Sequence, residues 1–151
     1  FTFGDPERQY YETICGGAGA TSDAAGASAV HTHMTNSRLT DPEILERRFP
    51  VRLEAFEIRP GSGGHGRRRG GDGARRRLRF LASMDAALLS TRREHAPQGI
   101  AGGGPAASGT QRLIRASGEE AELSGCFSMA VETGDVLEIE TPGGGGYGRP
   151  H

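Results

Sequence analysis

Residues 74–82 read ARRRLRFLA, and this stretch decides the fold because its side chains alternate strictly in character. On an extended strand, every second residue points to the same side of the sheet. One face is therefore expected to carry Ala74, Arg76, Leu78, Phe80 and Ala82. The intervening residues are mostly arginines, so the alternation predicts a β-strand with one buried and one solvated face.

The preceding segment, residues 51–58, follows the same period of two and then departs from it. Apolar residues alternate with charged ones from Val51 to Ala55, and the pattern slips at Phe56 and Ile58. A slip of one residue within a strand predicts a β-bulge. Further strands are expected over residues 86–90, 111–116, 120–123, 127–131 and 136–141, separated by glycine-containing turns.

These short strands predict a mainly β fold with one or two short helices, in the α+β class. The arrangement expected is an irregular sandwich or a barrel-like sheet with glycine-rich loops. Residues 1–40 are expected to contain turns and short polar stretches. We expect a motif-bearing segment with a short helix over residues 1–50 and a β-rich region over 51–151. Together they should form one compact unit of a longer chain.

One helix is signalled clearly by the residues at its start. The sequence Thr40-Asp41-Pro42-Glu43 offers an N-cap, a proline in the first turn and a glutamate three residues after the threonine. The helix should run from residue 42 to about residue 48 and end before Pro50.

Composition excludes several classes of protein. The formal net charge of −1 is incompatible with nucleic-acid binding driven by overall charge. No run of about 18 apolar residues is present, so no membrane span is expected. The two cysteines, Cys15 and Cys126, lack the spacing of a metal site or a disulfide framework, which favours a reducing cytoplasm. The 25 glycines predict many tight turns and close packing against polypeptide outside this stretch.

Seven arginines lie within residues 67–79. They could form an anion or nucleic-acid site, a solvated strand face, or part of a subunit interface. Because the chain is nearly neutral overall, the sequence favours a solvated face. Two glycine strings, at residues 61–66 and 143–148, match G-x-G-x-x-G. No helix signal follows either string, so a dinucleotide site is not expected.

The candidate functional residues follow a glycine-rich turn at residues 16–20. His31 and His33 are two positions apart, so an extended backbone would send both imidazoles to the same face. They could be metal ligands, general acids or bases, or structural hydrogen-bonding groups. Asn36 and Arg38 could orient an anionic substrate. Cys15 precedes two glycines and is either an exposed nucleophile or a small buried residue.

At these residues the chain resembles the C-terminal part of the B-type subunit of the hydantoinase B / 5-oxoprolinase family. The matching stretches run in order along nearly the whole sequence. They are residues 10–14 (YYETI), 16–19 (GGAG), 30–36 (VHTHMTN), 45–52 (LERRFPVR), 61–64 (GSGG), 70–73 (GGDG), 102–105 (GGGP) and 140–148 (ETPGGGGYG).

The resemblance implies an ATP-dependent amidohydrolase that opens cyclic amides such as 5-oxoproline or hydantoins. In that family the ring carbonyl is expected to be phosphorylated and then attacked by water. His31 and His33 would be catalytic residues, and Asn36 and Arg38 would bind the substrate. The cofactor-binding and metal-ligating residues are left unassigned. An acetone- or acetophenone-carboxylase-type subunit and a non-catalytic assembly domain remain alternatives.

The resemblance also implies the surroundings of the chain. The whole enzyme would use ATP and a divalent metal such as Mg, with neither bound by this segment alone. The expected partners are a hydantoinase A-type subunit or domain, the rest of the B-type chain and a small cyclic amide. No nucleic acid or membrane is expected to bind. The enzyme should form an oligomer in the cytoplasm.

Overall fold

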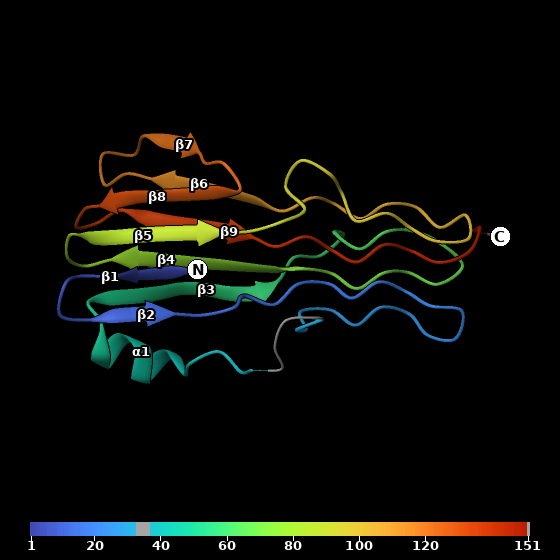
Figure 1. Cartoon of the computed structure of the whole chain (residues 1–151), viewed down its shortest axis with the longest axis horizontal. Coiled ribbons are helices and arrows are strands. Elements are labelled where there is room, and N and C mark those ends of the chain that lie inside the picture. Colours follow the sequence, from blue (N-terminus) through green and yellow to red (C-terminus); the bar gives the residue numbers. More distant parts are fainter. Residues whose placement is uncertain (33–36, 151) are drawn as a thin grey trace.

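The computed structural model describes residues 1–32 and 37–150, which form two antiparallel sheets and one helix. The first sheet has the order β2-β1-β5-β8, from Gln9–Tyr11, Thr2–Gly4, Met84–Leu89 and Cys126–Val131. The second has the order β3-β4-β9-β6-β7, from Val51–Ile58, Ala74–Phe80, Val136–Glu140, Thr110–Ile114 and Glu120–Glu122. The helix is α1, Pro42–Arg48. Figure 1 shows these elements gathered at one end of an elongated molecule.

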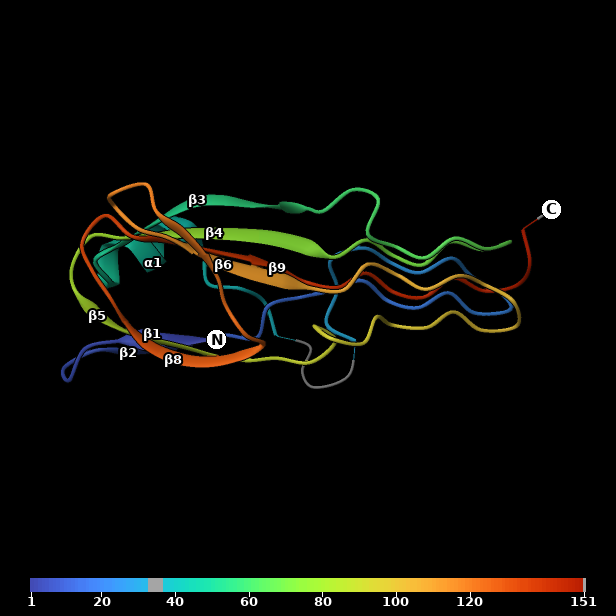
Figure 2. The same ribbon diagram turned by 90° about the horizontal axis from the view of Figure 1, so that it is seen from above.

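The two sheets pack face to face as an open sandwich, seen edge-on in Figure 2. Strand β4 supplies the clearest part of the core, because its burial alternates residue by residue. Ala74, Arg76, Leu78 and Phe80 are buried, which confirms the face predicted from the sequence. The predicted class, mainly β with a short helix, is confirmed, and the sandwich rather than a barrel is the form it takes.

The later strands begin and end within about two residues of their predicted positions. The bulge in β3 is also present, with the register shift between Leu53 and Ala55, just before the predicted slip. Glu54 is the extra residue, and its carboxylate accepts hydrogen bonds from Arg77 and Arg79. The shift thus turns Glu54 toward the arginine-bearing face of β4.

The expectation of only turns and polar stretches over residues 1–40 was wrong, because β1 and β2 lie there. Each strand has three residues, too few to display a period. They form because β1 pairs with both β2 and β5. Phe3 of β1 packs against Phe49 and Phe80, so burial of aromatic rings stabilises this pairing.

Helix α1 covers the edge of the sandwich beside β2 and β3 (Figures 1 and 2). Its range is the predicted one, but its N-cap is Asp41, whose carboxylate accepts a hydrogen bond from the Glu43 N–H at 2.9 Å. Asp41 rather than Thr40 therefore caps the helix. Leu45 is fully buried and joins the core between the sheets.

A second region extends away from the sandwich and is built almost without side chains. We call it the glycine bundle: residues 16–29, 61–73, 97–107 and 142–148, which lie side by side in Figures 1 and 2. These segments are extended but lie outside both sheets. Backbone hydrogen bonds join them, including Gly71 N–H to the Ala18 carbonyl and Gly144 N–H to the Gly71 carbonyl, both 2.8 Å.

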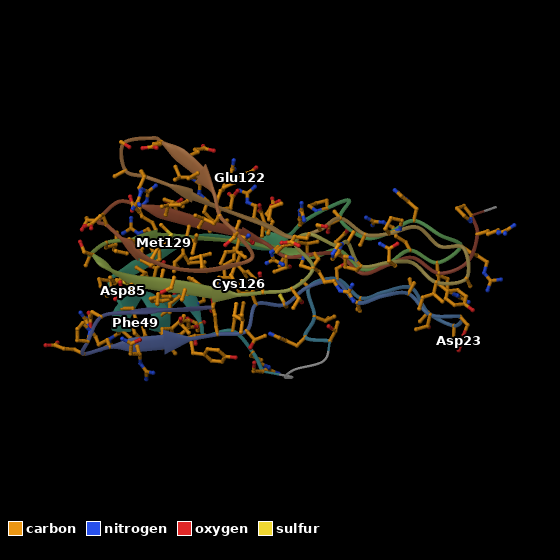
Figure 3. All side chains as sticks on the ribbon, turned by 45° about the horizontal axis from the view of Figure 1, so that its top comes forward. Asp23, Phe49, Asp85, Glu122, Cys126 and Met129 are labelled. Atoms are coloured by element: carbon orange, nitrogen blue, oxygen red, sulfur yellow. The ribbon has the colours of Figure 1, made fainter. Side chains whose placement is uncertain are left out.

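The bundle requires glycine because its backbones approach too closely for a side chain. A Cβ atom on Gly144 would lie 1.8 Å from the Ala18 carbonyl oxygen. The same constraint places glycine at the crowded axis of the collagen triple helix. Figure 3 shows side chains filling the sandwich and thinning out toward Asp23 at the far end of the bundle.

Candidate functional site

His31 lies where the first segment of the bundle returns to the sandwich. Its neighbour Val30 is fixed by two backbone hydrogen bonds to Gly16, at 2.8 and 3.1 Å. The half-buried His31 ring places Nε2 2.7 Å from the Thr13 carbonyl oxygen. Because a carbonyl only accepts hydrogen bonds, Nε2 carries the hydrogen and Nδ1 is the nitrogen able to accept a proton. His31 itself lies outside the strands, just beyond the single bridge between Gly16 and Val30.

Arg38 is the other predicted residue that the structure describes. It is exposed and borders a shallow pocket beside the end of β2. The pocket is lined by Tyr10, Tyr11, Glu12, Thr13, Ser37, Arg38, Leu39 and Thr40. Since Thr13 also binds His31, the two predicted residues adjoin the same short stretch of chain. His33 and Asn36 lie outside the described residues, so their roles and the shared face of the two histidines stay predictions.

A buried ion pair lies beneath this stretch. Arg76 Nε is 2.6 Å from Glu12 Oε1, and Arg76 Nη2 donates to Oε2 at 2.9 Å. The two side chains are only 2% and 3% exposed. Tyr10 donates its hydroxyl to Glu12 Oε2 at 3.0 Å. Burial, and then the negative charge of Glu12, raise the pKa of Tyr10, so its hydroxyl stays protonated and remains a donor.

The sequence carries half of the signal for this pair. Alternation in β4 places Arg76 on the core face, and a buried guanidinium requires a counter-ion. Which carboxylate fills that role is not encoded locally, because Glu12 lies 64 positions away.

Cys15 is buried, and this burial raises the pKa of its thiol. The thiolate needed for nucleophilic attack is therefore disfavoured, and Cys15 fits a small packed residue better than a nucleophile. Neither Cys15 nor Cys126 is in a disulfide.

The arginine-rich run divides between three environments. Arg75, Arg77 and Arg79 lie on the outer face of β4 and pair with glutamates, as a solvated strand face predicts. Arg76 instead points inward, and residues 67–69 belong to the glycine bundle. The outer face therefore neutralises its own charge and leaves no large basic patch on β4.

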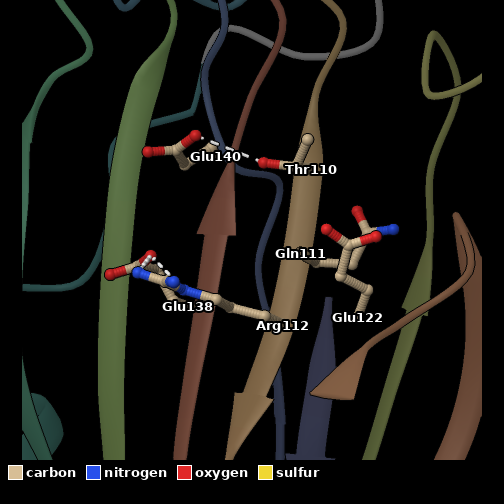
Figure 4. Close-up of a pocket in the computed structure, with 6 residues that line it drawn as sticks. All are labelled: Thr110, Gln111, Arg112, Glu122, Glu138 and Glu140. Carbon is tan, nitrogen blue, oxygen red and sulfur yellow. Dashed lines mark hydrogen bonds and ion pairs between the residues drawn. The ribbon is translucent and has the colours of Figure 1, made fainter. Parts of the chain in front are cut away.

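A hollow on the same face, shown in Figure 4, is likewise occupied by internal pairs. Arg112 Nη2 lies 2.8 Å from Glu138 Oε1, and Thr110 donates to Glu140 at 3.2 Å. Glu140 also pairs with Arg59 at 3.0 Å. This network has the character of a salt-bridged sheet surface rather than a ligand site.

Within residues 1–32 and 37–150, no three histidine, cysteine, aspartate or glutamate side chains gather in a way that could hold a metal ion. No glycine string precedes a helix there either, so the described residues do not fit a phosphate-binding loop. ATP and its metal therefore have no evident site among these residues. The same part of the chain contains no helix long and apolar enough to cross a membrane.

Comparison with known proteins places this fold and its residues in one family. The Hydantoinase B/oxoprolinase family matches residues 1–150, and the chain belongs to that family. It is 47% identical to 5-oxoprolinase 1 of Arabidopsis thaliana over 147 residues, 97% of this chain and 12% of that protein. A more distant relative is a Pseudomonas protein assigned as the B-type component of a D-/L-hydantoinase, 29% identical, with 93% of this chain and 24% of that protein covered.

Among solved structures, the crystal structure of the ATP-dependent caprolactamase from Pseudomonas jessenii superposes with a TM-score of 0.80 at 26% identity. The likeness covers 99% of this chain and 29% of the caprolactamase chain. The chain thus spans about an eighth of the plant 5-oxoprolinase. Its family includes ATP-dependent enzymes and a protein named as one subunit of a larger assembly.

Proposed function

We propose that this chain is the C-terminal part of an ATP-dependent hydrolase of cyclic amides, acting on 5-oxoproline. The observation that carries the proposal is the 47% identity with 5-oxoprolinase 1 over 97% of the chain. The caprolactamase supports the same class, since its name also describes ATP-dependent opening of a cyclic amide. Hydantoins are the next substrate class to test, in view of the hydantoinase relative from Pseudomonas.

His31 acts as the general base in this proposal. Its Nε2–H donates to the Thr13 carbonyl, which orients the ring and leaves Nδ1 to take a proton from the attacking water. Arg38 binds the carboxylate of 5-oxoproline, because a guanidinium pairs with a carboxylate in bidentate fashion. His33 and Asn36 complete the site as a second catalytic residue and a substrate-binding amide.

ATP and Mg are handled outside this segment, by a hydantoinase A-type subunit or domain, with further contributions from the rest of the B-type chain. ATP supplies the activation of the ring carbonyl when it is bound, and the described residues here offer it no site. We place the oligomeric enzyme in the cytoplasm, consistent with two free cysteines.

The test uses the full-length enzyme together with its A-type partner. ATP hydrolysis should depend on 5-oxoproline, and His31→Ala should lower the coupled rate by about tenfold or more. His95→Ala is the matched control, since His95 is exposed in a loop away from Thr13. An unchanged rate in His31→Ala removes His31 from the site. ATP consumption that depends on bicarbonate and a ketone, and not on a ring amide, would contradict the hydrolase assignment in favour of a carboxylase.

A non-catalytic assembly role is the second candidate, favoured by the glycine bundle. Four extended segments tied by backbone hydrogen bonds form a stiff projection suited to holding other polypeptide in place. In that case His31→Ala would leave the rate unchanged, and disruption of the bundle would dissociate the subunits.

A further inference from the structure

The buried pair of Glu12 and Arg76 is the feature of the molecule that its fold explains least. Both side chains are almost completely buried, and the guanidinium also lies 5.5 Å from the centre of the Phe56 ring. Removing two charges from water costs several kcal/mol per ion, so apolar residues of similar size often stabilise a core equally well. A pair retained at this cost is better explained by the geometry it imposes on neighbouring groups.

Glu12 lies between two groups that hold the candidate site. On one side, Thr13 accepts the hydrogen bond from His31 at 2.7 Å. On the other, the Tyr10 hydroxyl donates to Glu12 and also hydrogen-bonds with the Thr40 side chain. Residues 31 and 40 are therefore fastened to the same four residues of chain, 10–13, and Arg38 borders the pocket between these attachments.

Arg76 connects this support to the rigid part of the fold. It lies in the middle of β4, where its neighbours pair with β3 on one side and with β9 on the other. Residues 12 and 13 follow β2, an edge strand whose ladder ends at Tyr11. Without a link to β4, Glu12 and Thr13 would be held chiefly by backbone contacts with the first residue of the chain. The two contacts of the ion pair supply that link.

We propose that Arg76, Glu12 and Tyr10 are positioning residues, which hold His31 and Arg38 in the geometry that ring opening requires. The inference rests on the proposed function for its catalytic consequence. Its structural content stands independently, because the contacts join β4 to both ends of residues 31–40 whichever reaction takes place.

The experiment uses the full-length enzyme with its A-type partner and the variants Tyr10→Phe, Glu12→Gln and Arg76→Lys. Each weakens one link and keeps the approximate volume of the side chain. The catalytic efficiency kcat/KM for 5-oxoproline should fall by about tenfold to a hundredfold, because small misplacements of catalytic groups are costly. The KM for ATP should not change. Arg79→Lys is the matched control, since Arg79 lies on the opposite face of β4 and pairs with Glu54.

Amide hydrogen exchange provides a readout independent of activity. Exchange of residues 37–40 should become at least about tenfold faster in Tyr10→Phe and Glu12→Gln, and strands β4 and β9 should remain protected. Unchanged exchange at residues 37–40 in every variant would overturn the proposal. A uniform increase across the sandwich would also overturn it, because this would show a general role in stability.

The two proposals fail in different ways. If His31→Ala has no effect but exchange at residues 37–40 still responds to Tyr10→Phe, the positioning contacts are real and the catalytic assignment is wrong. If His31→Ala inactivates the enzyme and the three variants change neither exchange nor kcat/KM, the positioning role is wrong and the catalytic one stands.

Discussion

The sandwich and the glycine bundle are stabilised by opposite means within one chain. In the sandwich, buried side chains such as Leu78 and Phe80 fill the space between two sheets. In the bundle, backbones lie so close that side chains are excluded, and hydrogen bonds between main-chain groups replace the hydrophobic core. The difference teaches that the low apolar content of this chain reflects a second mode of packing rather than a weak core.

The largest expected effect comes from adding one methyl group to the bundle. The Cβ of Gly144→Ala would meet the Ala18 carbonyl oxygen at 1.8 Å, and neither backbone can move without breaking its hydrogen bonds. We expect a loss of more than about 4 kcal/mol in the free energy of unfolding. Urea unfolding followed by circular dichroism measures it.

Gly19→Ala is the matched control for this substitution, because its Cβ would find its nearest neighbour at 3.8 Å. Its stability should stay within about 1 kcal/mol of the parent. Equal effects of the two substitutions would contradict the close-approach explanation of the bundle.

A smaller effect is expected from removing side-chain volume in the sandwich. Leu78→Ala should destabilise the chain by about 2–5 kcal/mol, because it leaves a cavity among fully buried residues. Leu81→Ala, at a residue 43% exposed, should cost far less. Thermal unfolding of the two variants compares them directly. A cost for Leu81→Ala as large as that for Leu78→Ala would mean that burial in the sandwich is not what stabilises it.

The smallest effect concerns one aspartate in each region. Burial would raise the pKa of Asp72 in the bundle, but a 2.7 Å hydrogen bond from Gly63 N–H and the charge of Arg69 hold it below its usual value. In the sandwich, burial would likewise raise the pKa of Asp135, but hydrogen bonds from Glu132 N–H and Arg115 outweigh it and lower that pKa. Both carboxylates therefore favour the folded state when ionised.

A carboxylate whose pKa is lower in the folded than in the unfolded state stabilises fully above its unfolded pKa, near 4, and this stability is lost as pH falls through the folded value. Asp72→Asn and Asp135→Asn should each cost about 1–3 kcal/mol at pH 7. The deficit should shrink below pH 4. Hydrogen exchange should rise mainly in the bundle for Asp72→Asn and mainly in the sandwich for Asp135→Asn. A deficit that is independent of pH would exclude the ionised carboxylates as its source.

The sequence predicted those elements whose signal is local. Alternation over residues 74–80 identified β4 and its buried face, and the residues from Thr40 to Glu43 located the start of α1. The slip in β3 located the bulge to within a few residues. The same reasoning failed for β1 and β2, since three-residue strands have no period and exist only through their partners.

For the candidate site, the sequence supplied His31 and Arg38 as residue types but not their support. Thr13, Tyr10 and Glu12 read as ordinary polar residues until the fold places them beside residues 31 and 40. The division of the chain at residue 50 stays a prediction, and strands from both sides of that position share one sheet.

By itself, the sequence determined the periods of the strands, the helix and its limits, the glycine content and the family resemblance, because each is written in residues near one another. Only the tertiary structure decided which backbones meet in the bundle and which carboxylate neutralises Arg76. Those outcomes depend on contacts between residues far apart in the chain, such as the 64 positions between Glu12 and Arg76. Their geometry is fixed only when both sheets have closed over the core.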